Sequence, residues 1–225
     1  MLLNIDYQPY MAVIGDIVQS KKLIERQPVQ LKFKKILEEI NSDYHAEVAS
    51  KFMVTLGDEF QGLLKTGQSA VYIVDKIERE MFPVRLRFGI GIGEITTNID
   101  SDMPLGADGP AYYNARKGIN GLKTAERKNK KAKGNISIEI QDNPEMSELL
   151  NTIFKLLSTI KKTWTSRKVE VMNAYLRCGG TQMDTAKVLH ITQGSVQKAL
   201  ASANFYVYRE ALKNISNVLS AVKRE

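Results

Sequence analysis

The sequence predicts an α+β protein in two parts, an N-terminal part built on an antiparallel sheet and a C-terminal part built only of helices. Three observations predict it. Up to residue 143, segments whose apolar residues alternate as in a strand are interspersed with segments whose apolar residues have helical spacing. After residue 143 the apolar residues have helical spacing throughout. The composition is globular, with 43% hydrophobic and 25% charged residues. The charge is uneven, because residues 1–145 carry 20 Lys and Arg against 20 Asp and Glu, whereas residues 146–225 carry 12 against 5.

The N-terminal part is predicted to follow the order β-α-β-β-α-β-α-β. The expected strands are residues 10–15, 51–56, 60–64, 84–94 and 136–140, and the expected helices are residues 28–43, 70–81 and 111–121. Gly57 and Asp58 form a turn between the second and third strands. The first six elements match a split βαβ, or ferredoxin-like, arrangement, which is an antiparallel sheet with helices on one face.

The strand at residues 84–94 has two unlike faces. One face is apolar and the other is almost bare beyond Arg87: Val84, Leu86, Phe88, Ile90 and Ile92 lie on the first, and Gly89, Gly91 and Gly93 on the second. A bare face lets a ligand or another backbone approach closely. A strand bend at a sheet edge or barrel is the alternative explanation of the glycines.

Three carboxylates follow strands that are neighbours in this arrangement. Asp16 follows the first strand, and Asp58 and Glu59 lie at the hairpin tip, so the end of the first strand and the hairpin turn can meet at one edge of the sheet. Carboxylate oxygens are ligands that Mg²⁺ prefers, with substrate phosphates completing the shell. We expect a site for Mg²⁺ or Mn²⁺ here. The alternative is that Asp58 is a turn residue and Asp16 a helix cap.

Four motifs resemble those of nucleotide cyclases. Gly15-Asp16-Ile17-Val18 resembles the first metal motif of class III nucleotide cyclases, residues 88–94 their glycine-rich strand and residues 109–116 their later helix, while residues 56–60 are similar to the hairpin signature of diguanylate cyclases. As a whole the chain resembles the SatD family, which pairs such a region with a helix-turn-helix. The resemblance implies a cyclase-like palm domain that binds a nucleotide triphosphate or cyclic nucleotide, and it suggests a homodimer.

The expected nucleotide site combines the bare glycine face with cations for the phosphates. Its residues are Gly89, Gly91, Gly93, Arg116, Lys117, Lys123 and Arg127. Two positions depart from the cyclase patterns. Asn114 and Arg116 are two residues apart, where class III cyclases place an Asn and an Arg four apart, and Leu56 replaces the first glycine of the diguanylate signature. These departures favour nucleotide binding or an altered reaction over ordinary cyclisation.

The C-terminal part is predicted to contain a long helix up to Trp164, followed by helices at residues 165–176, 182–190 and 193–203. The spacing of Ala186, Ile191 and Val196 is that of a helix-turn-helix and resembles sigma-factor region 4. His190 stands at the turn where glycine is usual, and we expect a left-handed backbone there.

The helix at residues 193–203 would be the recognition helix. Glutamine side chains pair with adenine edges, and Ser and Lys reach phosphates or guanine. The candidate DNA-binding residues are Thr192, Gln193, Ser195, Gln197, Lys198 and Ser202. The positive charge of residues 146–225 favours DNA as the partner. The alternative is a three-helix bundle that binds protein or a second subunit.

Several classes are excluded. Cys178 is the only cysteine, so no intrachain disulfide forms, and the lone His45 and His190 do not indicate zinc. The chain lacks a basic, apolar secretion signal at its start and an apolar run near the ~20 residues that span a bilayer. We therefore expect a soluble, cytoplasmic protein without a membrane partner.

The leading interpretation is a cytoplasmic DNA-binding regulatory protein. Residues 1–145 would form the palm domain that binds a nucleotide with Mg²⁺, and residues 146–225 the helix-turn-helix domain. One alternative is an enzyme, a nucleotidyl cyclase or related nucleotidyltransferase with a helix-turn-helix tail. A second alternative is a non-catalytic interaction scaffold.

Overall fold

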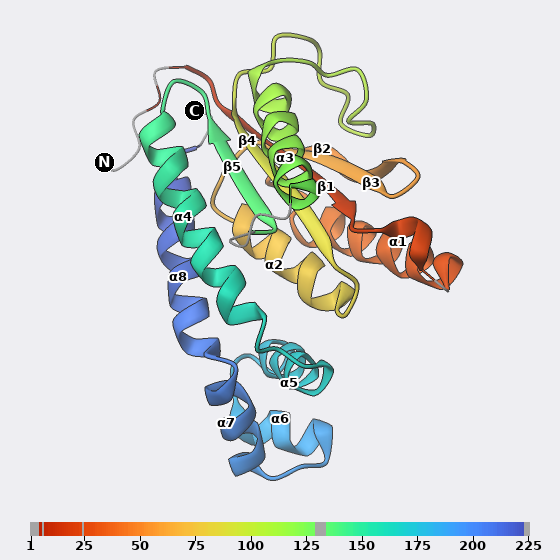
Figure 1. The fold of residues 1–225 in the computed structure, drawn as a ribbon, viewed down its shortest axis with the longest axis vertical. Coiled ribbons are helices and arrows are strands. Elements are labelled where there is room, and N and C mark those ends of the chain that lie inside the picture. The colour runs from red at the N-terminus through yellow and green to blue at the C-terminus, as the bar shows by residue number, and fades with distance from the viewer. Residues whose placement is uncertain (1–4, 6, 24, 129–133, 223–225) are drawn as a thin grey trace.

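A computed structural model describes residue 5 and residues 7–23, 25–128 and 134–222 (Figure 1). The strands are β1 (Tyr10–Ile17), β2 (Val48–Leu56), β3 (Glu59–Leu64), β4 (Leu86–Gly93) and β5 (Ile136–Ile140). The helices are η1 (Ser20–Lys22), α1 (Arg26–Asp43), α2 (Ala70–Met81), α3 (Pro110–Arg127), α4 (Pro144–Lys161), α5 (Ser166–Arg177), α6 (Gln182–Leu189), α7 (Gln193–Ser202) and α8 (Phe205–Leu219). The predicted order is confirmed. α3 extends past residue 121 into the basic segment 123–133, of which residues 129–133 lie outside the described residues.

Within the described residues the sheet has the order β2-β3-β1-β4-β5. β1 is antiparallel to both β3 and β4, which is the split βαβ arrangement that the sequence predicts. β5 differs from the predicted antiparallel sheet because it pairs parallel to β4. The reason is that α3 crosses over between β4 and β5 and returns the chain to the same end of the sheet.

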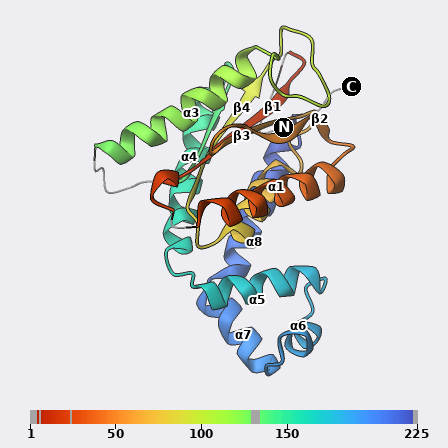
Figure 2. The same cartoon turned by 90° about the vertical axis from the view of Figure 1, so that its right-hand side faces the viewer.

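The two faces of the sheet carry different layers. Figures 1 and 2 show α1 and α2 on one face and α3 on the other. On the first face the rings of Phe33, Phe60 and Phe88 pack edge to face, with centroids 5.1 and 6.0 Å apart. On the α3 face, Ala12 and Ile14 of β1 pack in a smaller core. Because side chains alternate along a strand, Asp16 falls on the α3 face.

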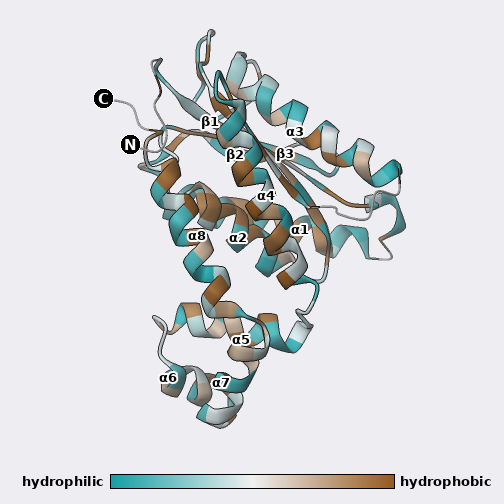
Figure 3. Ribbon diagram, turned by 60° about the vertical axis from the view of Figure 1, so that its left-hand side comes forward, coloured by the Kyte–Doolittle hydropathy of each residue, from teal (hydrophilic) through white to brown (hydrophobic). Residues whose placement is uncertain are grey.

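α4 and α8 extend the main core beyond the sheet. Buried apolar residues form one continuous cluster from the strands to α8, and hydrophobic segments are prominent in α2, α4 and α8 (Figure 3). α4 buries Phe154 and its neighbours Leu150 and Leu157, whereas Leu149 and Leu156, which predicted this helix, are 54% and 65% exposed. The predicted division after residue 145 stays a prediction, and the core is continuous across it.

The end of α8 returns to the sheet. The Gly67 amide donates to the Val222 carbonyl at 2.8 Å, and the Ser216 hydroxyl donates to the Gln68 carbonyl at 2.7 Å. α5, α6 and α7 lie at the end of the molecule away from the sheet (Figures 1 and 2). None of the helices in the described part of the chain is long and apolar enough to cross a membrane.

The buried carboxylate of Asp75 connects α2 to α8. It accepts a hydrogen bond from the Tyr208 hydroxyl at 3.0 Å and pairs with Arg79 at 2.9 Å and Arg209 at 3.4 Å. Burial and the neighbouring Asp75 charge raise the pKa of Tyr208 well above its usual range. The hydroxyl therefore stays protonated and keeps donating.

Candidate functional site

Asp16 and Asp58 meet at one edge of the sheet. Asp16 lies at the end of β1, directly opposite Glu59 of β3 and Arg87 of β4. The Ile17 amide donates to the Asp58 carbonyl at 3.2 Å, which holds the β2–β3 turn beside β1. Both aspartates line one cavity of about 520 Å³, together with Val18, Gln19, Arg87, Lys123, Glu126 and Arg127. The structure thus brings together the strand ends that the sequence analysis paired.

The Asp16 carboxylate is buried between two cations. Asp16 is only 4% exposed. The Arg87 guanidinium donates to Oδ1 through Nε at 2.8 Å and to Oδ2 through Nη2 at 3.3 Å. The Lys123 ammonium lies 2.8 Å from Oδ2. Both carboxylate oxygens therefore have charged partners.

The network continues to two more carboxylates. Lys123 also lies 3.8 Å from Glu59 Oε2, and Glu59 Oε1 accepts from Arg116 at 2.7 Å. Arg87 Nη1 donates to Glu126 at 2.8 Å. Three acids are thus matched by three bases. Removing one partner of such a buried pair costs more than the pair contributes, because the other charge is left unpaired.

These carboxylates are of the kind that binds Mg²⁺, but their cation partners compete with the ion. The oxygen donors are of the right type, and Asp16, Asp58 and Glu59 are the residues that would hold the ion. However, the Lys123 ammonium lies between Asp16 and Glu59 and takes the place of a bridging cation. Among the described residues, no group of three or more His, Cys, Asp or Glu side chains is placed to hold a metal ion. Mg²⁺ fits only when Lys123 has moved to another anion.

The glycine face of β4 lies against a helix and does not border this cavity. A Cβ at Gly89 would stand 2.1 Å from the Ala115 carbonyl oxygen, and one at Gly91 would stand 2.0 Å from that of Ala111. At Gly93 the nearest atom, 2.8 Å away, belongs to the backbone of α3. The expectation that Gly89, Gly91 and Gly93 border the cavity is therefore wrong, because the backbone of α3 covers them.

The predicted cations are distributed along α3. Lys123 and Arg127 line the cavity. Arg116 joins the network through Glu59. Lys117 pairs with Glu139 of β5 at 2.8 Å, and its side chain is 72% exposed. Asn114, the other residue that resembles the cyclase helix, donates to the Ile92 carbonyl at 2.9 Å.

Arg87 and Glu126 line the cavity but are not among the predicted site residues. Arg87 lies on the glycine face of β4. The pairing of β4 with β1 places Arg87 beside Asp16, and a prediction of this pairing could have identified Arg87 as a site residue. Glu126 is the only acid in the basic segment 123–133. Its position one helical turn after Lys123 on α3 indicates that both point to the same side.

The turn between α6 and α7 has the backbone that the sequence predicts. His190 has φ 52° and ψ 45°, the left-handed conformation. The Ile191 amide donates to the Ala186 carbonyl at 3.0 Å, which closes α6. The Thr192 side chain accepts from the Ser195 amide at 3.1 Å and caps α7. Val196 is fully buried. The predicted helices and turn are therefore confirmed as local structure.

One side of α7 is open to solvent. All six candidate DNA-binding residues are exposed, namely Thr192, Gln193, Ser195, Gln197, Lys198 and Ser202. Thr192 and Ser195 also bond to each other through their hydroxyls at 2.9 Å, and the Ser202 hydroxyl donates to the Ala199 carbonyl at 3.1 Å. The hydroxyl groups of this face, on Thr192, Ser195 and Ser202, thus have local partners. The longer polar side chains of the face belong to Gln193, Gln197 and Lys198.

The similarity of the chain to solved structures is low. None of the curated proteins matches the chain. A bacterial light-regulated adenylyl cyclase is 14% identical with a TM-score of 0.43, over 58% of this chain and 74% of that chain. A non-canonical dimeric guanylyl cyclase domain from Blastocladiella emersonii is 16% identical with a TM-score of 0.39, over 51% and 74%. A regulator of polyketide synthase expression from Bifidobacterium adolescentis is 11% identical with a TM-score of 0.29, over 95% and 83%.

The comparison with protein families covers most of the chain. The profile of the SatD family matches residues 10–219, which extend from the first residue of β1 to the last of α8. The match therefore includes the sheet with its ion-pair network as well as the helices that follow. The chain belongs to the SatD family.

Proposed function

We propose that the chain is a cytoplasmic DNA-binding regulatory protein, in which α6 and α7 form a helix-turn-helix and the Asp16 cavity binds a nucleotide. The observation that carries the proposal is the α6–α7 turn. A left-handed residue, a threonine cap and a buried valine hold α7 at a fixed angle to α6. Recognition helices of this kind need such a rigid support to enter the major groove.

The composition of α7 supports DNA as its ligand. Gln193 is in the first turn of α7, where helix-turn-helix proteins contact base edges, and Gln197 follows one turn later. Lys198 is exposed beside them and would contact a phosphate. The excess of 12 basic over 5 acidic residues in residues 146–225 would attract the DNA backbone.

The cavity supports an anionic, phosphate-bearing ligand. Arg127 is exposed at its rim, and within the described residues it makes no ion pair. A nucleotide with Mg²⁺ or Mn²⁺ would give Lys123 a phosphate partner and would give Asp16 and Glu59 the metal. Such an exchange keeps the charges of the network balanced. The metal would neutralise the phosphates in this site.

An enzymatic role has less support. Arg116 and Asn114, which resemble cyclase residues, have partners within the sheet layer. Nucleotide triphosphates with Mg²⁺ or Mn²⁺ should therefore be recovered unchanged after incubation with the chain. Formation of a cyclic or transferred product would identify a nucleotidyl cyclase or nucleotidyltransferase instead. We also propose a homodimer, since two copies would present two α7 helices to two half-sites.

The DNA proposal is tested with the full chain. Bound sequences are first selected from a random duplex library, and affinity is then measured by fluorescence anisotropy across a salt series. We expect affinity to fall steeply with salt, with a slope of about 0.9 per phosphate contact. Lys198→Ala should weaken binding to all sequences and flatten the slope by about one unit. Gln197→Ala should reduce discrimination between sites by about 1–3 kcal/mol.

Lys155→Ala is the matched control, because Lys155 is exposed on α4 and has the same charge. It should leave the salt slope unchanged. Equal effects of the Lys155 and Lys198 substitutions would show that α7 has no special role. No affinity of the full chain for duplex DNA at low salt would refute the DNA proposal.

The nucleotide site has a separate test. Equilibrium dialysis with ATP and GTP, each with Mg²⁺, should show binding that Arg127→Gln weakens and Lys155→Gln does not. Arg127 is exposed and lies outside the ion pairs of Asp16, so this substitution should leave the fold intact. Absence of binding for both nucleotides would restrict the proposal to DNA.

A further inference from the structure

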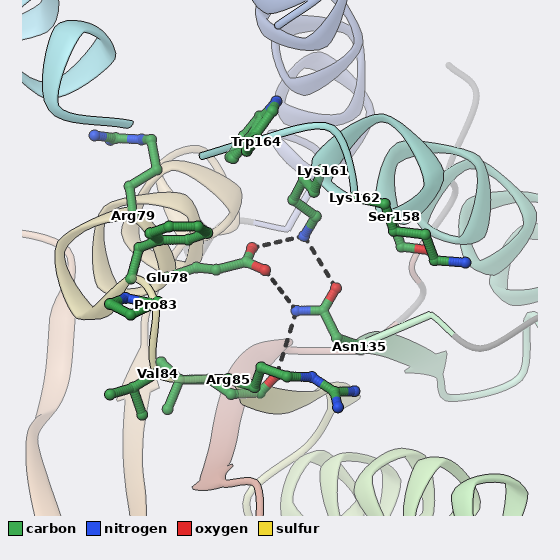
Figure 4. A pocket seen from close by; sticks show the side chains of 12 residues that line it. Glu78, Arg79, Pro83, Val84, Arg85, Asn135, Ser158, Lys161, Lys162 and Trp164 are labelled. Atoms are coloured by element: carbon green, nitrogen blue, oxygen red, sulfur yellow. Dashed lines mark hydrogen bonds and ion pairs between the residues drawn. The ribbon is translucent and has the colours of Figure 1, made fainter. Parts of the chain in front are cut away.

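A second cavity lies where the sheet, α2 and α4 meet (Figure 4). It has a volume of about 370 Å³, within the range of about 300–1,000 Å³ that is typical of small-molecule sites. Residues 82–86, from the end of α2 to the first residue of β4, form one side. Ser158, Lys161 and Lys162 at the end of α4, with Trp164 just after it, form the other.

A closed polar network forms one wall of this cavity. The Lys161 ammonium donates to Glu78 at 2.6 Å and to Asn135 at 3.0 Å. The Asn135 amide donates to Glu78 at 2.8 Å, which completes the triangle that Figure 4 shows. The Lys161 side chain is only 9% exposed. This wall is therefore fixed before any ligand arrives.

The charge of the cavity is not balanced. Its lining holds four bases, Arg79, Arg85, Lys161 and Lys162, against the single acid Glu78. Arg79 is neutralised by Asp75, and Lys161 by Glu78. Arg85 and Lys162 are exposed, and neither makes an ion pair with another residue in the described part of the chain. Two positive charges thus remain available to a ligand.

Apolar surface lies beside these charges. The apolar part of the lining is Phe82, Pro83, Val84 and Trp164, of which Trp164 is 7% exposed. A ligand that fills the cavity would contact both kinds of surface. The apolar surface would order a ring of the ligand, and the cations would attract its anionic group. Free inorganic anions would use only the charges.

We infer that this cavity binds a small organic anion that carries a planar ring. The anionic group would contact Arg85 and Lys162, and the ring would lie against Phe82 and Trp164. The site is distinct from the Asp16 cavity, since the two share none of their lining residues. The inference does not depend on DNA or nucleotide binding.

The chain contains its own reporter for this test. Trp164 is the only tryptophan among the 225 residues. Its emission, excited where tyrosine does not absorb, therefore comes from the wall of this cavity alone. Phenyl phosphate is the probe with both groups, inorganic phosphate has only the anion, and benzyl alcohol has only the ring.

We expect phenyl phosphate to change Trp164 emission saturably, and the two partial probes to bind about tenfold more weakly or worse. The double substitution Arg85→Gln and Lys162→Gln should weaken phenyl phosphate by at least about tenfold, because it removes two charged contacts. Lys155→Gln, on the same helix outside the cavity, should leave the affinity unchanged.

Calorimetric titration of the same samples detects binding that leaves the emission unchanged. Circular dichroism checks that the double variant is folded, as expected for two exposed positions. The inference is overturned if neither emission nor heat shows saturable binding of phenyl phosphate. It is equally overturned if the folded double variant binds phenyl phosphate as tightly as the wild type.

Discussion

Gly91→Ala tests whether the glycines of β4 exist to let α3 approach the sheet. The added Cβ would stand 2.0 Å from the Ala111 carbonyl oxygen and 2.3 Å from the Ala115 amide nitrogen, where real Cβ atoms essentially never come closer than 3.0 Å. α3 must therefore retreat by about 1 Å, because both atoms belong to the backbone and cannot rotate away. Overpacking of this kind costs about 1–3 kcal/mol, and we expect the upper end, about 3 kcal/mol.

The assay is urea unfolding followed by circular dichroism. With an m-value of about 3 kcal/mol/M, a loss of about 3 kcal/mol lowers the midpoint by about 1 M. Gly121→Ala is the control within α3, because its Cβ would meet nothing within 4 Å. Alanine is the better helix former, so this control should raise the free energy of unfolding by about 0.5–1 kcal/mol.

A Gly91→Ala variant that unfolds at the wild-type midpoint would refute the packing argument. If it also lost affinity for ATP and GTP, the glycine face would be a nucleotide site after all. A large loss of stability without a specific effect on nucleotide affinity supports the structural role. The two explanations therefore give opposite combinations of results.

Four further substitutions test other features. Asp16→Asn leaves Arg87 and Lys123 without their shared charged partner and should lower the free energy of unfolding by about 3 kcal/mol. Its control, Lys117→Gln, removes an exposed ion pair and should lower that free energy by less than about 1 kcal/mol. Similar losses for the two variants in urea unfolding would contradict this contrast. His190→Gly removes a side chain at φ 52° and should stabilise the fold by about 0.5–1 kcal/mol in thermal unfolding, so a lower midpoint would count against the strain argument. The buried Tyr112 hydroxyl has no hydrogen-bond partner among the described residues, and burial raises its pKa well above the usual range. Tyr112→Phe should therefore leave the free energy of unfolding unchanged or raise it by about 1 kcal/mol. A clear loss of stability in urea unfolding would show that the hydroxyl has a hydrogen-bond partner.

Local patterns predicted the elements well, and contacts between elements less well. The alternation of Phe88, Ile90 and Ile92 identified β4 and its apolar face, because one core imposes that period. The opposite face was ambiguous, since a bare strand accepts either a ligand or a helix backbone. Only the position of α3 decides between them, and that position depends on how β5 pairs with β4.

The site was predicted in part for a similar reason. Strand order alone brought Asp16 and Asp58 to one edge of the sheet. The contact of Lys123 with Asp16 and Glu59 depends on the length and direction of α3. The helix predicted from the sequence ended at residue 121, before Lys123. In α4, periodic apolar residues occur on two sides of the helix, so spacing could not show that Leu149 and Leu156 lie outside.

The return of α8 to the sheet means that residues 162–204 are a segment held at both of its ends. Both flanking helices are anchored, α4 on β5 and α8 through Gly67 and Gln68. A hinge at one end alone cannot swing this segment, because both of its ends are held and Arg79 of α2 also donates a hydrogen bond to Asn173 of α5. A protease nick at the α6–α7 turn would leave both halves attached to the remainder.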